Sequence, residues 1–160
     1  MVQIVSMHVL FVCTGNICRS PTAEAVFRHQ AAAHGLKVTV GSCGTHGYHI
    51  GAAPDPRSIH HAKLRGYDLS SLRATRLTRQ HFGKDHLLLA MDQGHLAILR
   101  RLAPQGHGAE LRLFLDTVPK FKGQDVPDPY YEGPEAFDHA LDLIERGVAA
   151  LIAELHQKQR

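Results

Sequence analysis

The sequence predicts an α/β fold in which a central four-stranded parallel sheet carries helices on both faces. Short apolar runs alternate with segments of helical periodicity, as expected when parallel strands are joined by crossover helices. The apolar runs are nearly continuous, which is typical of strands buried on both faces. The chain has 160 residues, enough for one core, and we expect a single domain over residues 1–160.

The first predicted strand is the run MHVLFVC, residues 7–13, which is short and apolar and contains β-branched residues. A helix is expected to start at Ser20 and Pro21, because serine is a favoured N-cap and proline is tolerated at the first helical position. His34 and Gly35 are expected to end this helix.

The second strand, LKVTVGS, is expected over residues 36–42, followed by a long loop. The Asp-Pro pair at positions 55 and 56 opens a short helix that Gly66 stops. Residues 67–77 show no regular pattern, and Thr78 is suited to capping a short helical turn.

The second half of the chain repeats the alternation. Residues 86–92 predict a third buried strand and residues 94–102 a helix, and residues 109–115 predict a fourth strand. A loop over 116–133 then leads into a strongly amphipathic helix over 134–156. These elements together predict a flavodoxin-like, doubly wound sheet, in which ligands bind beyond the carboxyl ends of the strands.

Composition narrows the class of protein. The net charge is +3 and no lysine-arginine tract is present, so we expect no nucleic-acid partner. The apolar stretch over residues 2–13 is too short to span a bilayer and lacks a cationic start, so we expect no membrane anchor or secretory signal and a cytoplasmic location. Three cysteines do not form a disulfide framework, and reduced thiols suit that compartment.

The stretch FVCTGNICRS, residues 11–20, allows three interpretations: a metal knuckle, a redox pair, or an anion-binding loop with a nucleophile. A structural zinc site usually needs four ligands in paired short spacings. Cys13, Cys18 and Cys43, even with His46 and His49, do not form such a pattern. We therefore expect no metal and no cofactor.

The anion interpretation follows from the spacing. Between Thr14 and Arg19 the backbone turns from strand to helix, and Gly15 and Asn16 both tolerate a positive φ, so the N–H groups can converge on one oxyanion. The Arg19 fork can bind two anion oxygens. Cys13 lies at the strand end beneath this cradle, where the N–H groups and the helix dipole favour a thiolate placed for in-line attack on phosphorus.

An acid is also needed, because attack by sulfur expels an alkoxide or phenoxide. The stretch VPDPYY supplies Asp128 between two prolines that stiffen the loop. On its own, an aspartate here is also consistent with an ordinary turn residue. The adjacent Tyr130 and Tyr131, which could form the wall of a cleft for an aromatic group, favour the functional interpretation.

Four segments, VCTGNICRSP, SCGTHGYHIGAAPDPRSI, AMDQGHL and VPDPYYEG, resemble low-molecular-weight protein tyrosine phosphatases in this order, and the resemblance covers almost the whole chain. It implies metal-independent hydrolysis of phosphotyrosine in proteins through a cysteinyl-phosphate. Cys13 would be the nucleophile and Arg19 the phosphate clamp. Asp128 would protonate the leaving group and then activate water.

The resemblance also implies roles for further residues. Asn16 and Ser42 would brace the loop, and Ser20 would give its hydroxyl to the Cys13 sulfur. Cys18 would form a reversible disulfide with Cys13 that protects against over-oxidation. The remaining implied phosphate-binding and rim residues are Thr14, Gly15, Ile17, Tyr48, Tyr130 and Tyr131.

The chain departs from the family pattern at the residues that would support Asn16 and Ser42. Many relatives have a histidine and an arginine where this chain has Leu72 and Thr75, so we expect the brace to differ in detail from theirs. Arg73 and Arg76 are candidates to compensate.

Two other activities, known from related families of the same fold, are kept as alternatives for this protein. Arginine phosphatases carry threonine where Ile17 stands, and an apolar Ile17 favours an aromatic ring over a guanidinium. Thioredoxin-coupled arsenate reductases use further cysteines, and residues 66–100 contain none. A non-catalytic phosphotyrosine-binding module would be expected to lack Cys13 or Asp128, and both are present.

The expected partner is a phosphotyrosine-containing protein, with a tyrosine kinase as one candidate. Inorganic phosphate or vanadate is expected to bind as an inhibitor. We expect a monomer or a weak dimer.

Overall fold

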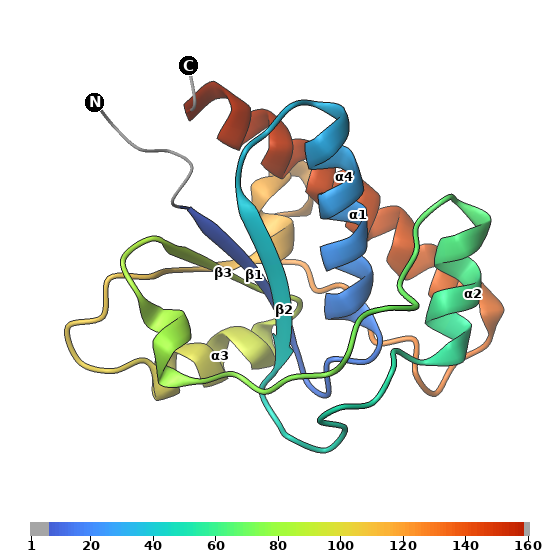
Figure 1. Ribbon diagram of the computed structural model, residues 1–160, viewed down its shortest axis with the longest axis horizontal. Helices are drawn as coiled ribbons and strands as arrows, with labels where there is room; N and C mark the ends of the chain where they lie inside the picture. Colours follow the sequence, from blue (N-terminus) through green and yellow to red (C-terminus); the bar gives the residue numbers. More distant parts are fainter. Residues whose placement is uncertain (1–6, 159–160) are drawn as a thin grey trace.

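The computed structural model describes residues 7–158 and has a parallel four-stranded sheet at its centre (Figure 1). The strands are β1 (His8–Cys13), β2 (Thr39–Gly44), β3 (His86–Ala90) and β4 (Glu110–Leu113). Their order is β2-β1-β3-β4, and every neighbouring pair is parallel. The predicted doubly wound α/β fold is therefore confirmed. The apolar stretch over residues 2–13 lies partly outside the described residues.

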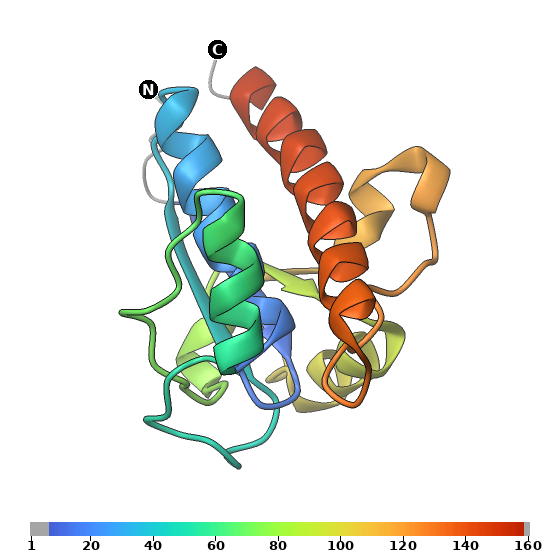
Figure 2. The same cartoon turned by 90° about the vertical axis from the view of Figure 1, so that its right-hand side faces the viewer.

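Helices cover both faces of the sheet (Figures 1 and 2). They are α1 (Arg19–Ala33), α2 (Pro56–Leu64), α3 (Gln93–Leu102) and α4 (Pro134–Lys158), with 3-10 turns η2 (Arg79–Phe82), η3 (Phe114–Thr117) and η4 (Pro119–Phe121). Alternate side chains of β1 point to opposite faces: Phe11 packs in the core with α1 and α4, and Val12 packs with α3. Within residues 7–158, no helix is both long enough and apolar enough to span a bilayer.

The amphipathic helix predicted after residue 133 is α4, which runs two residues beyond its predicted end. The apolar side chains that recur along it at helical spacing are all buried: Phe137, Leu141, Ile144, Val148, Leu151 and Leu155. Gly147 brings the α4 backbone against Phe114, so closely that a Cβ there would lie 2.3 Å from the ring Cζ. Phe114 in turn packs edge-on against Phe11, with ring centroids 5.5 Å apart. The loop that carries Asp128 therefore starts from a buried anchor.

Several strand boundaries differ from the prediction, and the third strand ends at Ala90, two residues before its predicted end. The second strand begins at Thr39, not Leu36, because the Leu36 N–H donates to Ala31 O in the turn that ends α1, and pairing with β1 begins where Thr39 meets His8. The fourth strand ends at Leu113, the last partner of β3, and the chain then enters η3.

Candidate active site

The candidate site lies at the carboxyl ends of β1 and β3, adjacent strands from which the chain continues in opposite directions across the sheet. A cavity of about 500 Å³ opens there. It is lined by Cys13, Thr14, Gly15, Ile17, Cys18, Arg19, Tyr48, His49, Asp128, Tyr130 and Tyr131. The structure thus brings the predicted nucleophile, clamp and acid into one cavity, although Asp128 lies more than 100 positions from Cys13 and Arg19 in the sequence.

The start of α1 differs from the expectation. The helix begins at Arg19 with Cys18 at the N-cap, so Ser20 is not the capping residue. Cys18 makes no side-chain hydrogen bond to the first turn, which leaves the N–H groups of that turn uncapped by a side chain. An uncapped helix start that faces a cavity is suited to binding an anion.

Asn16 and Gly15, at the apex of the loop, are required there for different physical reasons. Asn16 has a φ of 58°, as anticipated for a tight turn. Gly15 was expected to have a positive φ and does not. A Cβ at position 15 would lie 2.8 Å from His49 Cδ2, so the glycine is needed for the close approach of the neighbouring loop.

Asn16, 2% exposed, is the centre of a buried polar network behind the loop. Its Nδ2 donates to Ser20 Oγ at 2.8 Å and to Ser42 Oγ at 2.9 Å, and Ser42 Oγ donates to Glu24 Oε1 at 2.6 Å. Ser20 Oγ also lies 2.9 Å from Cys13 Sγ. Because Ser20 Oγ already accepts from Asn16, its own proton is available to the sulfur. The same contacts explain why this hydroxyl does not cap the helix.

The network is completed by the peptide group of residue 75. The backbone N–H of Thr75 donates to Asn16 Oδ1 at 2.9 Å, and the Thr75 hydroxyl donates to Ser42 O at 3.1 Å. Leu72 packs against the core. Arg73 donates to the carbonyls of Ser70 and Leu72, and the compensation expected of it in this network is not seen.

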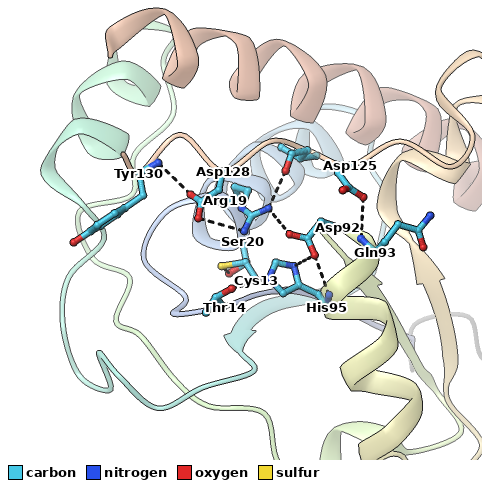
Figure 3. Close-up of polar contacts among 11 residues, drawn as sticks. Cys13, Thr14, Arg19, Ser20, Asp92, Gln93, His95, Asp125, Asp128 and Tyr130 are labelled. Carbon is cyan, nitrogen blue, oxygen red and sulfur yellow. Dashed lines mark hydrogen bonds and ion pairs between the residues drawn. The ribbon is translucent and has the colours of Figure 1, made fainter. Parts of the chain in front are cut away.

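Arg19 is 5% exposed and is held from behind by two acceptors (Figure 3). Its NH1 donates to Asp92 Oδ2 and to Val126 O, each at 2.8 Å. Its NH2 lies 3.6 Å from Asp128 Oδ2. Burial disfavours the charged form of Asp92, but hydrogen bonds and charges from His95 and Arg19 outweigh burial and lower the pKa of Asp92. The guanidinium is thereby oriented before any anion binds.

Asp128 and the tyrosines form the mouth of the cavity. The Asp128 side chain is 46% exposed, and its Oδ1 accepts from the Tyr130 N–H at 3.1 Å. Tyr130 and Tyr131 meet edge to face with centroids 4.8 Å apart, and Tyr131 is 90% exposed. Tyr48, on a different loop, stacks on His46. Two separate loops therefore supply the aromatic groups at the rim.

The two other cysteines are buried thiols. Burial is the main cause that raises the pKa of Cys18 to about 12, against a hydrogen bond with Ser58 that lowers it. Burial also raises the pKa of Cys43, which lies within the sheet as a small core residue. Over the described range 7–158, no three His, Cys, Asp or Glu side chains are grouped so as to hold a metal ion.

Two residues of the site were missed from the sequence: Asp92, which holds Arg19, and His95, whose Nε2 lies 2.8 Å from Thr14 Oγ1. One signal was available. A polar residue directly after the third strand must lie near Cys13 if the first and third strands are neighbours. That neighbour relation is not visible in the sequence.

Comparison with known proteins gives the family. A family model described as low molecular weight phosphotyrosine protein phosphatase matches residues 8–160. The chain belongs to this family. A low molecular weight protein-tyrosine-phosphatase of Streptomyces coelicolor is 42% identical over 156 residues, covering 94% of each chain. The protein is thus a phosphatase of this family, a phosphoric monoester hydrolase, and the resemblance inferred from the sequence is confirmed.

Solved structures agree with this assignment. A protein tyrosine phosphatase of Entamoeba histolytica, with Hepes in its active site, superposes with a TM-score of 0.87 at 34% identity, covering 97% of this chain and all of that one. A Drosophila arginine phosphatase of the same fold also has a TM-score of 0.87, at 26% identity, covering 92% of this chain and 97% of that one. The fold of this phosphatase family therefore occurs with more than one phosphorylated substrate.

Proposed function

We propose that this phosphatase hydrolyses phosphotyrosine in proteins through a cysteinyl-phosphate on Cys13. The observation that carries the proposal is the arrangement of Cys13, Arg19 and Asp128 in one cavity. The sulfur lies beside the uncapped start of α1, the guanidinium is oriented by Asp92, and the carboxylate lies at the mouth.

The chemistry follows from these positions. The Cys13 thiolate attacks phosphorus, an S–P bond forms and the ester P–O bond breaks, while Asp128 gives its proton to the departing phenolic oxygen. The loop N–H groups and Arg19 stabilise the charge on the phosphoryl oxygens. Asp128, now ionised, takes a proton from a water that attacks phosphorus, and the S–P bond breaks to release phosphate and the thiolate.

Substrate class is the finer part of the proposal. The apolar Ile17 lines the cavity together with Tyr48, Tyr130 and Tyr131, which suits a flat aromatic ring. A guanidinium substrate remains the second candidate, because an arginine phosphatase shares the fold. Arsenate reduction is disfavoured by the absence of cysteine from residues 66–100.

A panel assay tests the substrate class. Matched peptides that carry phosphotyrosine, phosphoarginine or phosphoserine are compared by phosphate release, with arsenate reduction measured in parallel. We expect the highest kcat/KM on phosphotyrosine and competitive inhibition by vanadate and inorganic phosphate. A higher kcat/KM on phosphoarginine would assign the protein to the second candidate.

Oxidation of the site gives a separate prediction. We expect mild peroxide to inactivate the enzyme reversibly, because Cys18 can trap oxidised Cys13 as a disulfide before further oxidation. Peroxide oxidises the Cys13 thiolate to a sulfenic acid, which the Cys18 thiol converts to the disulfide with loss of water. Since burial keeps Cys18 protonated at neutral pH, we expect disulfide formation to accelerate as pH rises.

The measurement is recovery of activity by dithiothreitol, with mass spectrometry of the oxidised protein. Cys18→Ser should make the loss irreversible, and Cys43→Ser serves as the matched control that keeps recovery. Absence of a Cys13–Cys18 link in the oxidised wild type would contradict this role for Cys18.

A further inference from the structure

His95 connects the two sides of the anion site, although no step of the proposed mechanism uses it (Figure 3). It is the third residue of α3 and is 3% exposed. Its Nε2 lies 2.8 Å from the hydroxyl oxygen of Thr14, which directly follows Cys13. Its backbone N–H donates to Asp92 Oδ1 at 2.9 Å, and its Nδ1 lies 3.2 Å from the same oxygen.

The other oxygen of the same carboxylate orients the clamp, because Asp92 Oδ2 accepts from Arg19 at 2.8 Å. A single buried ring therefore contacts both the residue beside the nucleophile and the carboxylate that holds the guanidinium. The main chain of Thr14 is also fixed, since its carbonyl accepts from the His46 N–H at 3.0 Å. The side-chain link to His95 is what joins this end of the loop to α3.

The ring is suited to such a link only when it is neutral. Burial is the main cause that lowers the pKa of His95 to about 4, with Asp92 acting against it and Arg19 adding to it. At neutral pH the imidazole therefore has one donor and one acceptor nitrogen. Nδ1 faces a carboxylate oxygen, although outside hydrogen-bonding geometry, so we assign the proton to Nδ1. Nε2 then accepts from the Thr14 hydroxyl.

We propose that His95 is a positioning residue that sets the Cys13–Thr14 end of the loop relative to the Arg19 guanidinium; this inference rests on the proposed function. In the transition state the loop N–H groups and Arg19 must meet the same phosphoryl oxygens. A misplacement of about 1 Å between catalytic groups can cost on the order of 100-fold in rate. Loss of the link should therefore lower kcat more than it raises KM.

Two amide substitutions separate the contacts of His95. A glutamine amide reaches roughly as far as Nε2 and can still accept from Thr14, whereas an asparagine amide reaches only as far as Nδ1. We expect His95→Asn to lower kcat for an aryl phosphate by roughly 10- to 100-fold, with KM changed less than about threefold. His95→Gln should retain several-fold more of the wild-type kcat.

Inhibitor binding gives a second readout. Vanadate resembles the transition state and phosphate the ground state, so His95→Asn should raise the Ki of vanadate about 10-fold and that of phosphate by less than about threefold. If His95 had only a structural role, His95→Asn would lower thermal stability and would change the Ki values of vanadate and phosphate by the same factor. His139→Asn, an exposed change on α4, is the matched control and should leave kcat and both Ki values unchanged.

The decisive comparison is made in a Thr14→Val background, which removes the hydroxyl and keeps the shape. There the advantage of His95→Gln over His95→Asn should disappear. Equal kcat for the two amide variants with Thr14 intact, or an advantage that persists with Thr14→Val, would overturn the proposal. If His95→Asn does not fold, a double-mutant cycle of Thr14→Val and His95→Gln tests the proposal. Losses of kcat that simply add in the double variant would refute the link between the two side chains. A wild type without aryl phosphatase activity would instead refute the proposed function, and the inference with it.

Discussion

Cys13→Ser is expected to lower kcat for an aryl phosphate by roughly 10⁴-fold or more, because a serine hydroxyl at this position has no general base to activate it. Ser20 Oγ, the hydroxyl 2.9 Å from Cys13 Sγ, is too weak a base to take the proton of a serine at position 13. Anion binding should survive, since the loop N–H groups and Arg19 are unchanged. Steady-state kinetics and the stabilisation of the protein by phosphate or vanadate in a thermal melt measure the two effects.

The control removes a different thiol. Cys43→Ala deletes a fully buried cysteine on the neighbouring strand and should leave kcat within about twofold of the wild type, because such a change affects packing alone. A Cys13→Ser enzyme with near-normal turnover would show that another residue is the nucleophile. Loss of phosphate stabilisation together with turnover would point to a collapsed loop.

Asp128→Ala is expected to slow substrates in proportion to the basicity of their leaving groups. For a phenyl phosphate or phosphotyrosine peptide, we expect kcat to fall by roughly 10²- to 10³-fold, the range typical of a lost general acid. For an ester with an acidic phenol, such as a nitrophenyl phosphate, the loss should be about tenfold or less, because that phenolate leaves without a proton. The measurement is a plot of log kcat against leaving-group pKa for wild type and variant.

Glu132→Ala is the matched control for the lost negative charge, since Glu132 is an exposed carboxylate four residues further along the same loop. It should not change the slope of the plot. An equal loss on all esters in Asp128→Ala would assign Asp128 to orienting Arg19, which lies 3.6 Å away, instead of to proton transfer.

Much of the fold and site could be predicted because the signals are local. The four apolar runs, the Asp-Pro start of α2 and the long periodicity of α4 each depend on neighbouring residues. The Cys13 to Arg19 loop is likewise one short segment whose spacing and side chains indicate an anion cradle. Asp128 could be singled out because two prolines and two tyrosines surround it.

The remainder depends on contacts between distant segments. Gly15 was interpreted through its own backbone freedom, whereas the actual constraint is the ring of His49, 34 positions away. Ser20 was assigned both to the helix start and to the Cys13 sulfur, but its hydroxyl contacts Cys13 and Asn16, and Cys18 is the N-cap. Asp92 was part of a noted motif, yet its role follows only from where β3 places it relative to Arg19. These relations require the strand order and the side-chain directions.

The peptide N–H of Thr75 that holds Asn16 Oδ1 has a consequence for how the sequence can evolve. A contact made by a side chain is lost by many single-codon changes, whereas a contact made by the main chain is lost by proline alone. Most substitutions at position 75 therefore leave this hold on the apex of the loop intact. Because this hold does not depend on the identity of residue 75, a substitution there removes only the hydroxyl contact with Ser42 O and keeps the contact with Asn16.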